Sequence, residues 1–308
     1  MSWLFASVIR IIILLTRKLQ KFLFYLDSRL DCGFDYRRHQ YWVKRSARAH
    51  NMLKDVDEQY YAAQYWAVIK KNLDELRCNP AGKYLDLGCG QGRLTIPLAQ
   101  WCSNAGGIVS GIDFSDSAIN QAKRYALQAG QNNIEFHIAD AGPYIRSLDK
   151  NSSDGIFVLE MLYFHADFQD ILKQCVRVLK PDAVLIVSLR SQYFYALDLV
   201  KEGTLEGIPM LLEKRSGRLF AGDVWFNWNT SKEIESLFTR DLGLKVIDLF
   251  GIGCCSGISG DPHASVALPS HLSQPDRDVL MQLETAVGYS LPDSGRYIMV
   301  VSRKIPAC

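Results

Sequence analysis

Short apolar runs alternate with segments of helical period through most of the chain after residue 82. The apolar runs predict seven strands, at residues 84–87, 107–113, 134–140, 154–160, 183–189, 244–250 and 296–302. The intervening segments predict helices at residues 94–101, 118–129, 168–179, 276–287 and from 230 onward. Regular alternation of this kind is typical of an α/β fold of three layers, in which helices cover both faces of a mostly parallel sheet.

Two segments interrupt this pattern. Residues 31–78 are rich in aromatic and charged side chains and read as a helical N-terminal cap that ends at 79–82, either closing over a ligand or simply packing. Residues 191–229 are too long for a simple connection and predict a functional insertion. Its aromatic side chains fit a pocket or the core equally well: Tyr193, Phe194, Tyr195, Trp225, Phe226 and Trp228.

The N-terminal arm, residues 1–30, has the pattern of an amphipathic helix. Over residues 3–26, Arg10, Arg17 and Lys21 fall within about 40° of one another on a helical wheel, and most other positions are apolar. The arm fits an in-plane membrane helix, a helix packed on the protein body, or a mitochondrial presequence. Its apolar runs are too short for a transmembrane span.

Composition narrows the class of protein. The chain has 308 residues, 48% hydrophobic and 22% charged, as expected for a globular protein. Its net charge of +2 combines ten basic and three acidic residues in positions 1–50 with a mildly acidic remainder. This distribution argues against a nucleic-acid-binding core and favours contact of the arm with an anionic surface such as membrane headgroups. Eight cysteines without a C-x-x-C pair or metal-ligand spacing predict reduced thiols, a cytoplasmic location and no metal site.

The segment at residues 83–95 carries the clearest chemical signal, a strand that leads through a glycine turn into a helix. Gly88 and Gly90 permit backbone angles and close ligand approach that a Cβ would obstruct, and Gly92 allows tight packing of the first helical turn. The dinucleotide pattern G-x-G-x-x-G would need a small residue at Arg93. The charge of Asp86 disfavours a nearby phosphate and suits a cationic ligand.

Asp86, Gly88, Gly90 and Gly92 match the (D/E)-x-G-x-G-x-G loop of the class I S-adenosylmethionine-dependent methyltransferases, which this chain resembles over about residues 60–304. The turn at 179–185 is similar to the L-(K/R)-P-G-G stretch of that family, with Asp182 and Ala183 in place of the two glycines. The resemblance implies S-adenosylmethionine as cofactor, a methyltransferase domain at 79–304, an acceptor pocket in the insertion at 191–229, and an antiparallel last strand inserted between the fifth and sixth strands.

Residues at the ends of the second and third strands extend the predicted cofactor site. Asp113 lies 25 positions after Gly88, near the spacing at which a carboxylate accepts both ribose hydroxyls, and Phe114 could flank the adenine. Asp140 and the N–H of Ala141 match family positions that bind the adenine, although strand-end aspartates are also common turn residues. The full predicted cofactor set is Asp86, Gly88, Cys89, Gly90, Gly92, Asp113, Phe114, Asp140, Ala141 and Glu160.

The sequence indicates the catalytic groups less clearly than it indicates the cofactor site. Glu160, Tyr163 and His165 follow the fourth strand, at the edge where open α/β sheets bind ligands. His165 could take a proton from the acceptor or serve only as a helix-cap or surface residue, and Glu160 could instead contact the methionine end of the cofactor. We expect O-, N- or C-methylation of a small lipophilic or aromatic acceptor. A nicotinamide-dependent oxidoreductase and a non-catalytic membrane-associated protein are the alternatives, and the sequence leaves the oligomeric state open.

Overall fold

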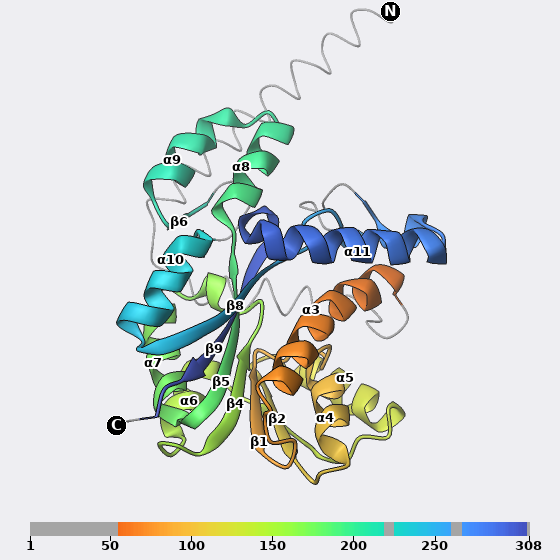
Figure 1. Cartoon of the computed structure of the whole chain (residues 1–308), viewed down its shortest axis with the longest axis vertical. Coiled ribbons are helices and arrows are strands. Elements are labelled where there is room, and N and C mark those ends of the chain that lie inside the picture. The colour runs from red at the N-terminus through yellow and green to blue at the C-terminus, as the bar shows by residue number, and fades with distance from the viewer. Residues whose placement is uncertain (1–54, 219–224, 260–266, 307–308) are drawn as a thin grey trace, which may run out of the picture.

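The computed structural model describes residues 55–218, 225–259 and 267–306, which fold around one seven-stranded sheet (Figure 1). The strand order is β3-β2-β1-β4-β5-β9-β8. Strands β1 to β5 pair in parallel, and β9 is antiparallel to both of its neighbours. The strands are β1 (Lys83–Leu87), β2 (Ile108–Asp113), β3 (Ile134–Ile138), β4 (Ser153–Val158), β5 (Leu179–Arg190), β8 (Leu244–Ile252) and β9 (Tyr297–Lys304).

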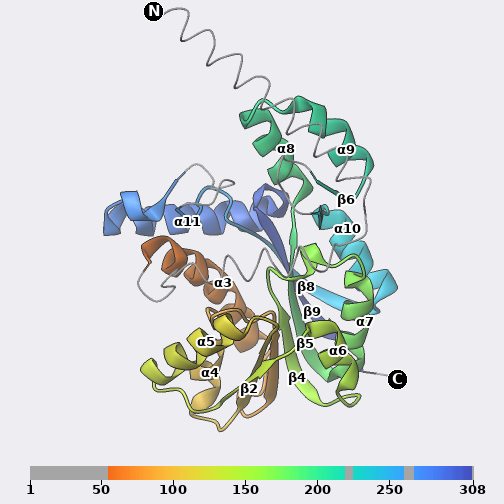
Figure 2. The same cartoon turned by 180° about the vertical axis from the view of Figure 1, so that it is seen from behind.

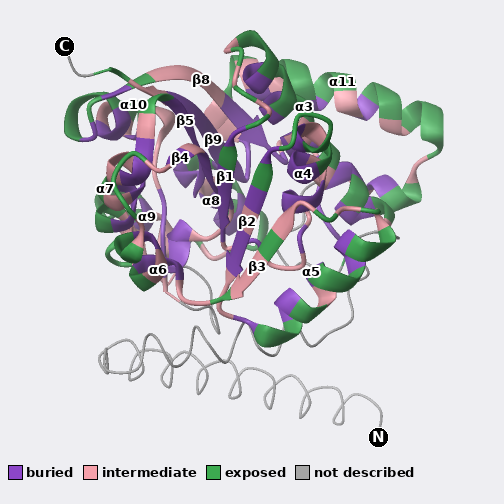
Figure 3. Cartoon of the chain, turned by 90° about the horizontal axis from the view of Figure 1, so that it is seen from below, coloured by how far each residue is buried: buried purple, intermediate pink, exposed green. Residues whose placement is uncertain are grey.

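Helices cover both faces of this sheet, so the predicted three-layer α/β fold and the inserted antiparallel strand are confirmed (Figures 2 and 3). One layer holds α3 (Val56–Glu75), α4 (Thr95–Ser103), α5 (Asp116–Gln128) and α11 (Gln274–Ser290). The other holds α6 (Ala141–Ser147), α7 (Phe168–Val178) and α10 (Ser231–Ser236), followed by the π-helical turn η3 (Leu237–Asp241). Each face of the sheet has its own buried apolar cluster, because every central strand contributes side chains alternately to both faces.

Local capping explains where several of these helices begin. The side chain of Asp55 accepts the N–H groups of Asp57 and Glu58 at the start of α3. A capping box starts α10, the helix predicted from residue 230 onward, since Thr230 and Glu233 bond each other's backbone N–H groups. Such caps satisfy donors that the first helical turn leaves without an intrahelical partner.

The predicted insertion at 191–229 contains secondary structure that the polar and apolar pattern did not reveal. It forms α8 (Gln192–Lys201), the 3-10 turn η2 (Leu205–Gly207), α9 (Ile208–Glu213) and a short hairpin of β6 (Ser216–Gly217) with β7 (Phe226–Asn227). Phe226 and Trp228 are buried in the cluster beside the sheet, whereas Tyr193 is half exposed. This burial fits the core interpretation for Phe226 and Trp228, and an acceptor pocket in this insertion stays a prediction.

The structure differs from the predicted elements at two places, a helix and a strand boundary. Helix α6 was not predicted, and it begins directly after β3 because Asp140 caps it. Strand β5 begins at Leu179 and not at Ala183. Its pairing register with β4 shifts between Ser153 and Gly155, so the strand includes residues 180–182, which were predicted as a turn. Asp182 adopts φ 65°, the conformation that glycine would favour at this turn.

The arm at 1–30, with its predicted amphipathic helix at 3–26, and residues 31–54 of the predicted cap lie outside the described residues. The later part of that cap is α3, which begins at Val56 and lies beside α11 (Figures 1 and 2). Among the helices that the structure does describe, none is long and apolar enough to cross a membrane.

Candidate functional site

The glycine loop between β1 and α4 adopts backbone angles that explain its composition. Gly88, Gly90 and Gly92 have φ values of 76°, 53° and 85°, which side-chain-bearing residues rarely adopt. A Cβ on Gly88 would lie 2.7 Å from the Met161 side chain, whereas a Cβ on Gly90 would meet no atom within 4 Å. Gly92 faces Ile96 in α4, the helix whose first turn it was predicted to accommodate. The loop thus presents bare backbone to open space at Gly90.

Asp113 ties this loop to the end of β2. Its Oδ2 accepts the N–H of Gly90 at 2.9 Å, and its Oδ1 accepts the N–H of Ser115 at 2.8 Å. Burial raises the pKa of Asp113 above its ordinary value, and the two backbone N–H groups oppose this shift. A carboxylate has about four acceptor positions, so each oxygen can still accept a hydroxyl donor.

Asp86 and Cys89 lie below the surface of the loop. Asp86 is buried and its Oδ2 accepts the Thr95 hydroxyl at 2.5 Å. Burial raises the pKa of Asp86 to about 6, with the Thr95 hydrogen bond opposing the shift, so the carboxyl is mostly ionised at neutral pH. Burial also raises the pKa of the Cys89 thiol well above its ordinary value. Asp86 therefore supplies negative charge beneath the loop, and Cys89 stays a neutral thiol.

The residues predicted to contact adenine occupy the ends of β2 and β3. Asp140 is the N-cap of α6 and its Oδ1 accepts the N–H of Gly142 at 3.0 Å. This contact is the turn role that aspartates commonly have at strand ends. Ala141 is buried at the first position of α6, and Phe114 is partly buried between Asp113 and Ser115. Contact of these residues with adenine stays a prediction.

Glu160 is held in an unusual conformation just after β4. Its φ of 54° is in the left-handed region, which non-glycine residues occupy at an energetic cost and mostly at functional sites. Its N–H donates to the Ser188 hydroxyl at 2.8 Å, and its Oε1 accepts Arg93 at 2.9 Å. Arg93 also donates to Glu58 of α3 at 3.1 Å. The Glu58–Arg93–Glu160 bridge thus joins α3, the glycine loop and the end of β4.

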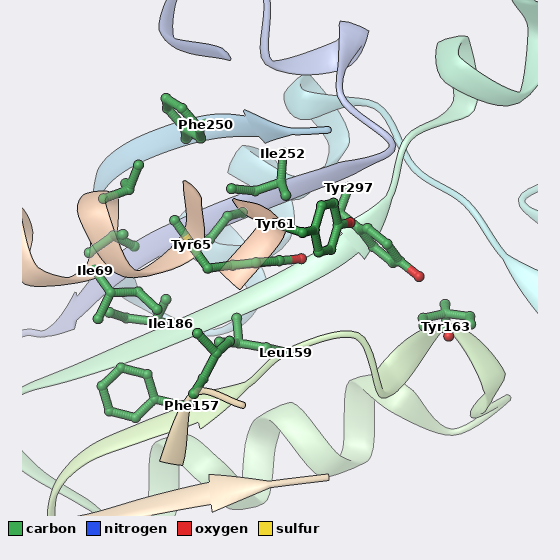
Figure 4. Packing of buried hydrophobic residues seen from close by; sticks show 14 of the residues in the cluster. Tyr61, Tyr65, Ile69, Phe157, Leu159, Tyr163, Ile186, Phe250, Ile252 and Tyr297 are labelled. Atoms are coloured by element: carbon green, nitrogen blue, oxygen red, sulfur yellow. The ribbon is translucent and has the colours of Figure 1, made fainter. Parts of the chain in front are cut away.

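Tyr163 and His165, the other two catalytic candidates, have different surroundings. Tyr163 is buried in the 3-10 turn η1 (Leu162–Phe164), with its ring centroid 5.6 Å from that of Tyr297 (Figure 4). The Arg190 guanidinium lies 4.0 Å from the Tyr163 ring centroid. His165 ends this turn with its Nδ1 3.8 Å from the Asp167 carboxylate, so the helix-cap description fits it. The structure therefore groups Tyr163 with Arg190 and Tyr297.

Sequence reasoning missed the roles of Arg93 and Arg190 in this region. Arg93 entered only as an argument against a dinucleotide motif, and Arg190 was not singled out. A signal for Arg190 was present, because a charged residue follows the apolar run at 183–189 where a parallel strand meets the ligand-binding edge. Within residues 55–218, 225–259 and 267–306, no group of three or more His, Cys, Asp or Glu side chains could hold a metal ion.

Comparisons with known proteins identify a family profile and relatives that this chain resembles. A family profile described as "Methyltransferase domain" matches residues 79–230. The ubiquinone biosynthesis O-methyltransferase of Coxiella burnetii (strain Dugway 5J108-111) is 37% identical over 116 residues, which are 37% of this chain and 47% of that protein. The protein of the same name from Haemophilus ducreyi is 31% identical over 134 residues, 42% of this chain and 54% of that protein. The chain thus spans about half the length of these curated relatives.

A solved structure supports the fold. The crystal structure of a Listeria monocytogenes protein, named as a candidate S-adenosylmethionine-dependent methyltransferase, has a TM-score of 0.52 and 18% identity. The match covers 80% of this chain and 98% of that one. The family profile disfavours the oxidoreductase alternative, because it describes methyltransferases. The matched profile shows that residues 79–230 form a methyltransferase domain, and the strand order and the glycine loop show that this domain has the fold of the class I S-adenosylmethionine-dependent methyltransferases.

Proposed function

We propose that this chain transfers a methyl group from S-adenosylmethionine to a hydroxyl oxygen of a small, lipophilic or aromatic acceptor. The observation that carries the proposal is the glycine loop, which Asp113 holds at Gly90 beside β1. Strand order reverses at β1, since β2 lies on one side of it and β4 on the other. Open α/β sheets bind nucleotide-like ligands at such a switch point.

The residues present fit this cofactor. A Cβ on Gly90 would enter open space, so a ligand can approach its backbone closely. Asp113 has acceptor capacity left for the ribose hydroxyls, and Asp140 with the N–H of Ala141 would bind the adenine. The carboxylates of Asp86 and Glu160 supply the negative charge that suits a sulfonium and an ammonium group. When bound, the cofactor supplies an electrophilic methyl group on sulfur.

The protein contributes mainly alignment to the reaction. The acceptor oxygen would take the methyl group that the bound cofactor would supply, and its hydroxyl proton would pass to a base or to water. Tyr163, His165 and Glu160 are the side chains proposed to position this hydroxyl or to accept its proton, and holding the groups in line is itself a large part of such catalysis. The names of the Coxiella and Haemophilus relatives support oxygen as the attacked atom.

The direct test is calorimetric titration with S-adenosylmethionine, S-adenosylhomocysteine and NAD, followed by transfer of a labelled methyl group to catechols and hydroquinols. We expect both adenosyl compounds to bind and NAD to give no heat. Heat with NAD alone would overturn the cofactor assignment. Binding of the cofactor without transfer to any hydroxylated acceptor would favour the non-catalytic alternative.

A matched pair of glycine substitutions localises the cofactor. Gly90 and Gly130 both have positive φ, 53° and 68°, and a Cβ on either meets no atom within 4 Å. Gly90→Ala and Gly130→Ala should therefore cost a similar backbone strain of about 1 kcal/mol each. Only Gly90→Ala should also weaken S-adenosylmethionine binding, by about tenfold or more. Equal affinities of the two variants would place the cofactor away from this loop.

We also propose that residues 3–26 bring the enzyme to an anionic membrane surface, on the basis of their sequence pattern alone. Deletion of residues 1–26 should abolish sedimentation with anionic liposomes and leave the affinity for the cofactor unchanged. Loss of cofactor binding with unchanged sedimentation would instead identify the arm as a segment packed on the protein body.

A further inference from the structure

Arg190 is a buried cation at the ligand-binding edge of the sheet. It is the last residue of β5, its exposed fraction is 7%, and its backbone pairs with Tyr297 of β9. Its neighbour on the same face of β5, Ser188, accepts the N–H of Glu160. Arg190 therefore lies one strand away from the Glu160 turn, close to the proposed acceptor site.

Aromatic rings surround this guanidinium. Its central carbon lies 4.0 Å from the ring centroid of Tyr163 and 4.2 Å from that of Phe226. The rings of Tyr195 and Phe164 follow at 5.1 and 5.6 Å. Ring faces attract a cation and hold it in place, but they do not satisfy its N–H donors.

Among the described residues, no carboxylate pairs with Arg190. The interactions of its side chain are ring contacts, and its buried Nε has no hydrogen-bond partner. Arg296, a second buried cation, also acts on it electrostatically. The Glu160 carboxylate pairs with Arg93 and not with Arg190. Buried ionised groups are normally paired, so this arrangement is unusual for a residue with a purely structural role.

We propose that Arg190 binds a carboxylate group of the methyl acceptor. The proposal rests on the proposed function and makes it more specific, since it names the acceptor as a hydroxylated aromatic or lipophilic acid. A guanidinium presents its donors in one plane as a rigid fork, which matches the two oxygens of a carboxylate. The Tyr163 ring, which lies against Arg190, would contact the apolar part of the same molecule. Arg296 adds positive charge and disfavours a cationic acceptor.

The experiment compares acids with their neutral isosteres. The probes are 3,4-dihydroxybenzoate, 4-hydroxycinnamate and octanoate, each with its primary amide, titrated into the full chain with and without S-adenosylhomocysteine. At least one acid should bind more tightly than its amide by about tenfold or more. In Arg190→Met this preference should disappear, whereas Arg190→Lys should retain part of it. Arg146→Met, which removes an arginine that is about half exposed, should behave as the parent protein.

The following results of these titrations would overturn the proposal. Equal affinity for acid and amide, persistence of the preference in Arg190→Met, or no binding of any acid at millimolar concentration would show that Arg190 is only a packing residue. Tighter binding of phenyl phosphate than of benzoate would assign the site to a different anion. Near-ultraviolet circular dichroism checks that Arg190→Met folds, and the comparison of acids with amides in the parent protein needs no variant.

The design separates this proposal from the proposed function. If S-adenosylhomocysteine does not bind the parent protein, the methyltransferase proposal fails, while the titrations without it still measure the preference for acids. If S-adenosylhomocysteine binds and the acids do not, the function stands and the carboxylate assignment fails.

Discussion

Arg93→Met is the most informative single perturbation of the site, because it removes one cation from between two partly buried carboxylates. The side chains of Arg93, Glu58 and Glu160 are 17%, 11% and 20% exposed, and the two ion-pair distances are 3.1 and 2.9 Å. Removing one partner of a buried pair typically costs about 3–5 kcal/mol. The partial exposure places the expected loss of unfolding free energy near the lower limit, about 3 kcal/mol. Met keeps most of the apolar stem, so packing against Tyr61 changes little.

Urea unfolding followed by tryptophan fluorescence measures this loss. With a slope of about 3 kcal/mol per molar urea, the midpoint should fall by about 1 M. Glu58→Gln should cost about 1–2 kcal/mol, because an amide oxygen can still accept from Arg93. The exposed pair Arg146–Asp170, with an N–O distance of 3.0 Å, provides the control, and Arg146→Met should cost about 0–1 kcal/mol. If Arg93→Met were no more costly than Arg146→Met, the bridge would not stabilise the contact between α3 and the loop.

Two further predictions concern the carboxylates at the glycine loop. Burial raises the folded-state pKa of Asp86 to about 6 from an ordinary 3.8, so its contribution to stability is present below pH 4 and is lost as the pH rises through 6, about 2–3 kcal/mol in all. Asp86→Asn should remove this pH dependence from urea unfolding measured between pH 4 and 8, and an unchanged profile would contradict the assignment. Asp113→Ala should weaken S-adenosylmethionine binding by at least about tenfold, or 1.4 kcal/mol, in a calorimetric titration. Unchanged affinity would exclude the ribose role.

The order of strands and helices and the glycine loop could be read from the sequence because they depend on neighbouring residues. Apolar periodicity is a local property, and so is the need for glycine where the backbone turns to positive φ, as at Gly88 and Gly90. The antiparallel strand β9 is different, since its place between β5 and β8 came from family resemblance and not from periodicity. Helix α6 was missed because a single capping residue, Asp140, starts it only two residues after the end of β3.

The surroundings of the charged residues were decided only by the tertiary structure. Arg93 and Glu160 are 67 positions apart in the chain, and nothing local indicates that they pair. Arg190 meets Tyr163 and Phe226 only because β5, η1 and the insertion converge at one edge of the sheet. Whether a charged side chain is paired or buried depends on groups that are distant in sequence. The sequence alone therefore identified the cofactor through its local glycine loop, whereas only the fold revealed Arg190, the cation that we propose selects the acceptor.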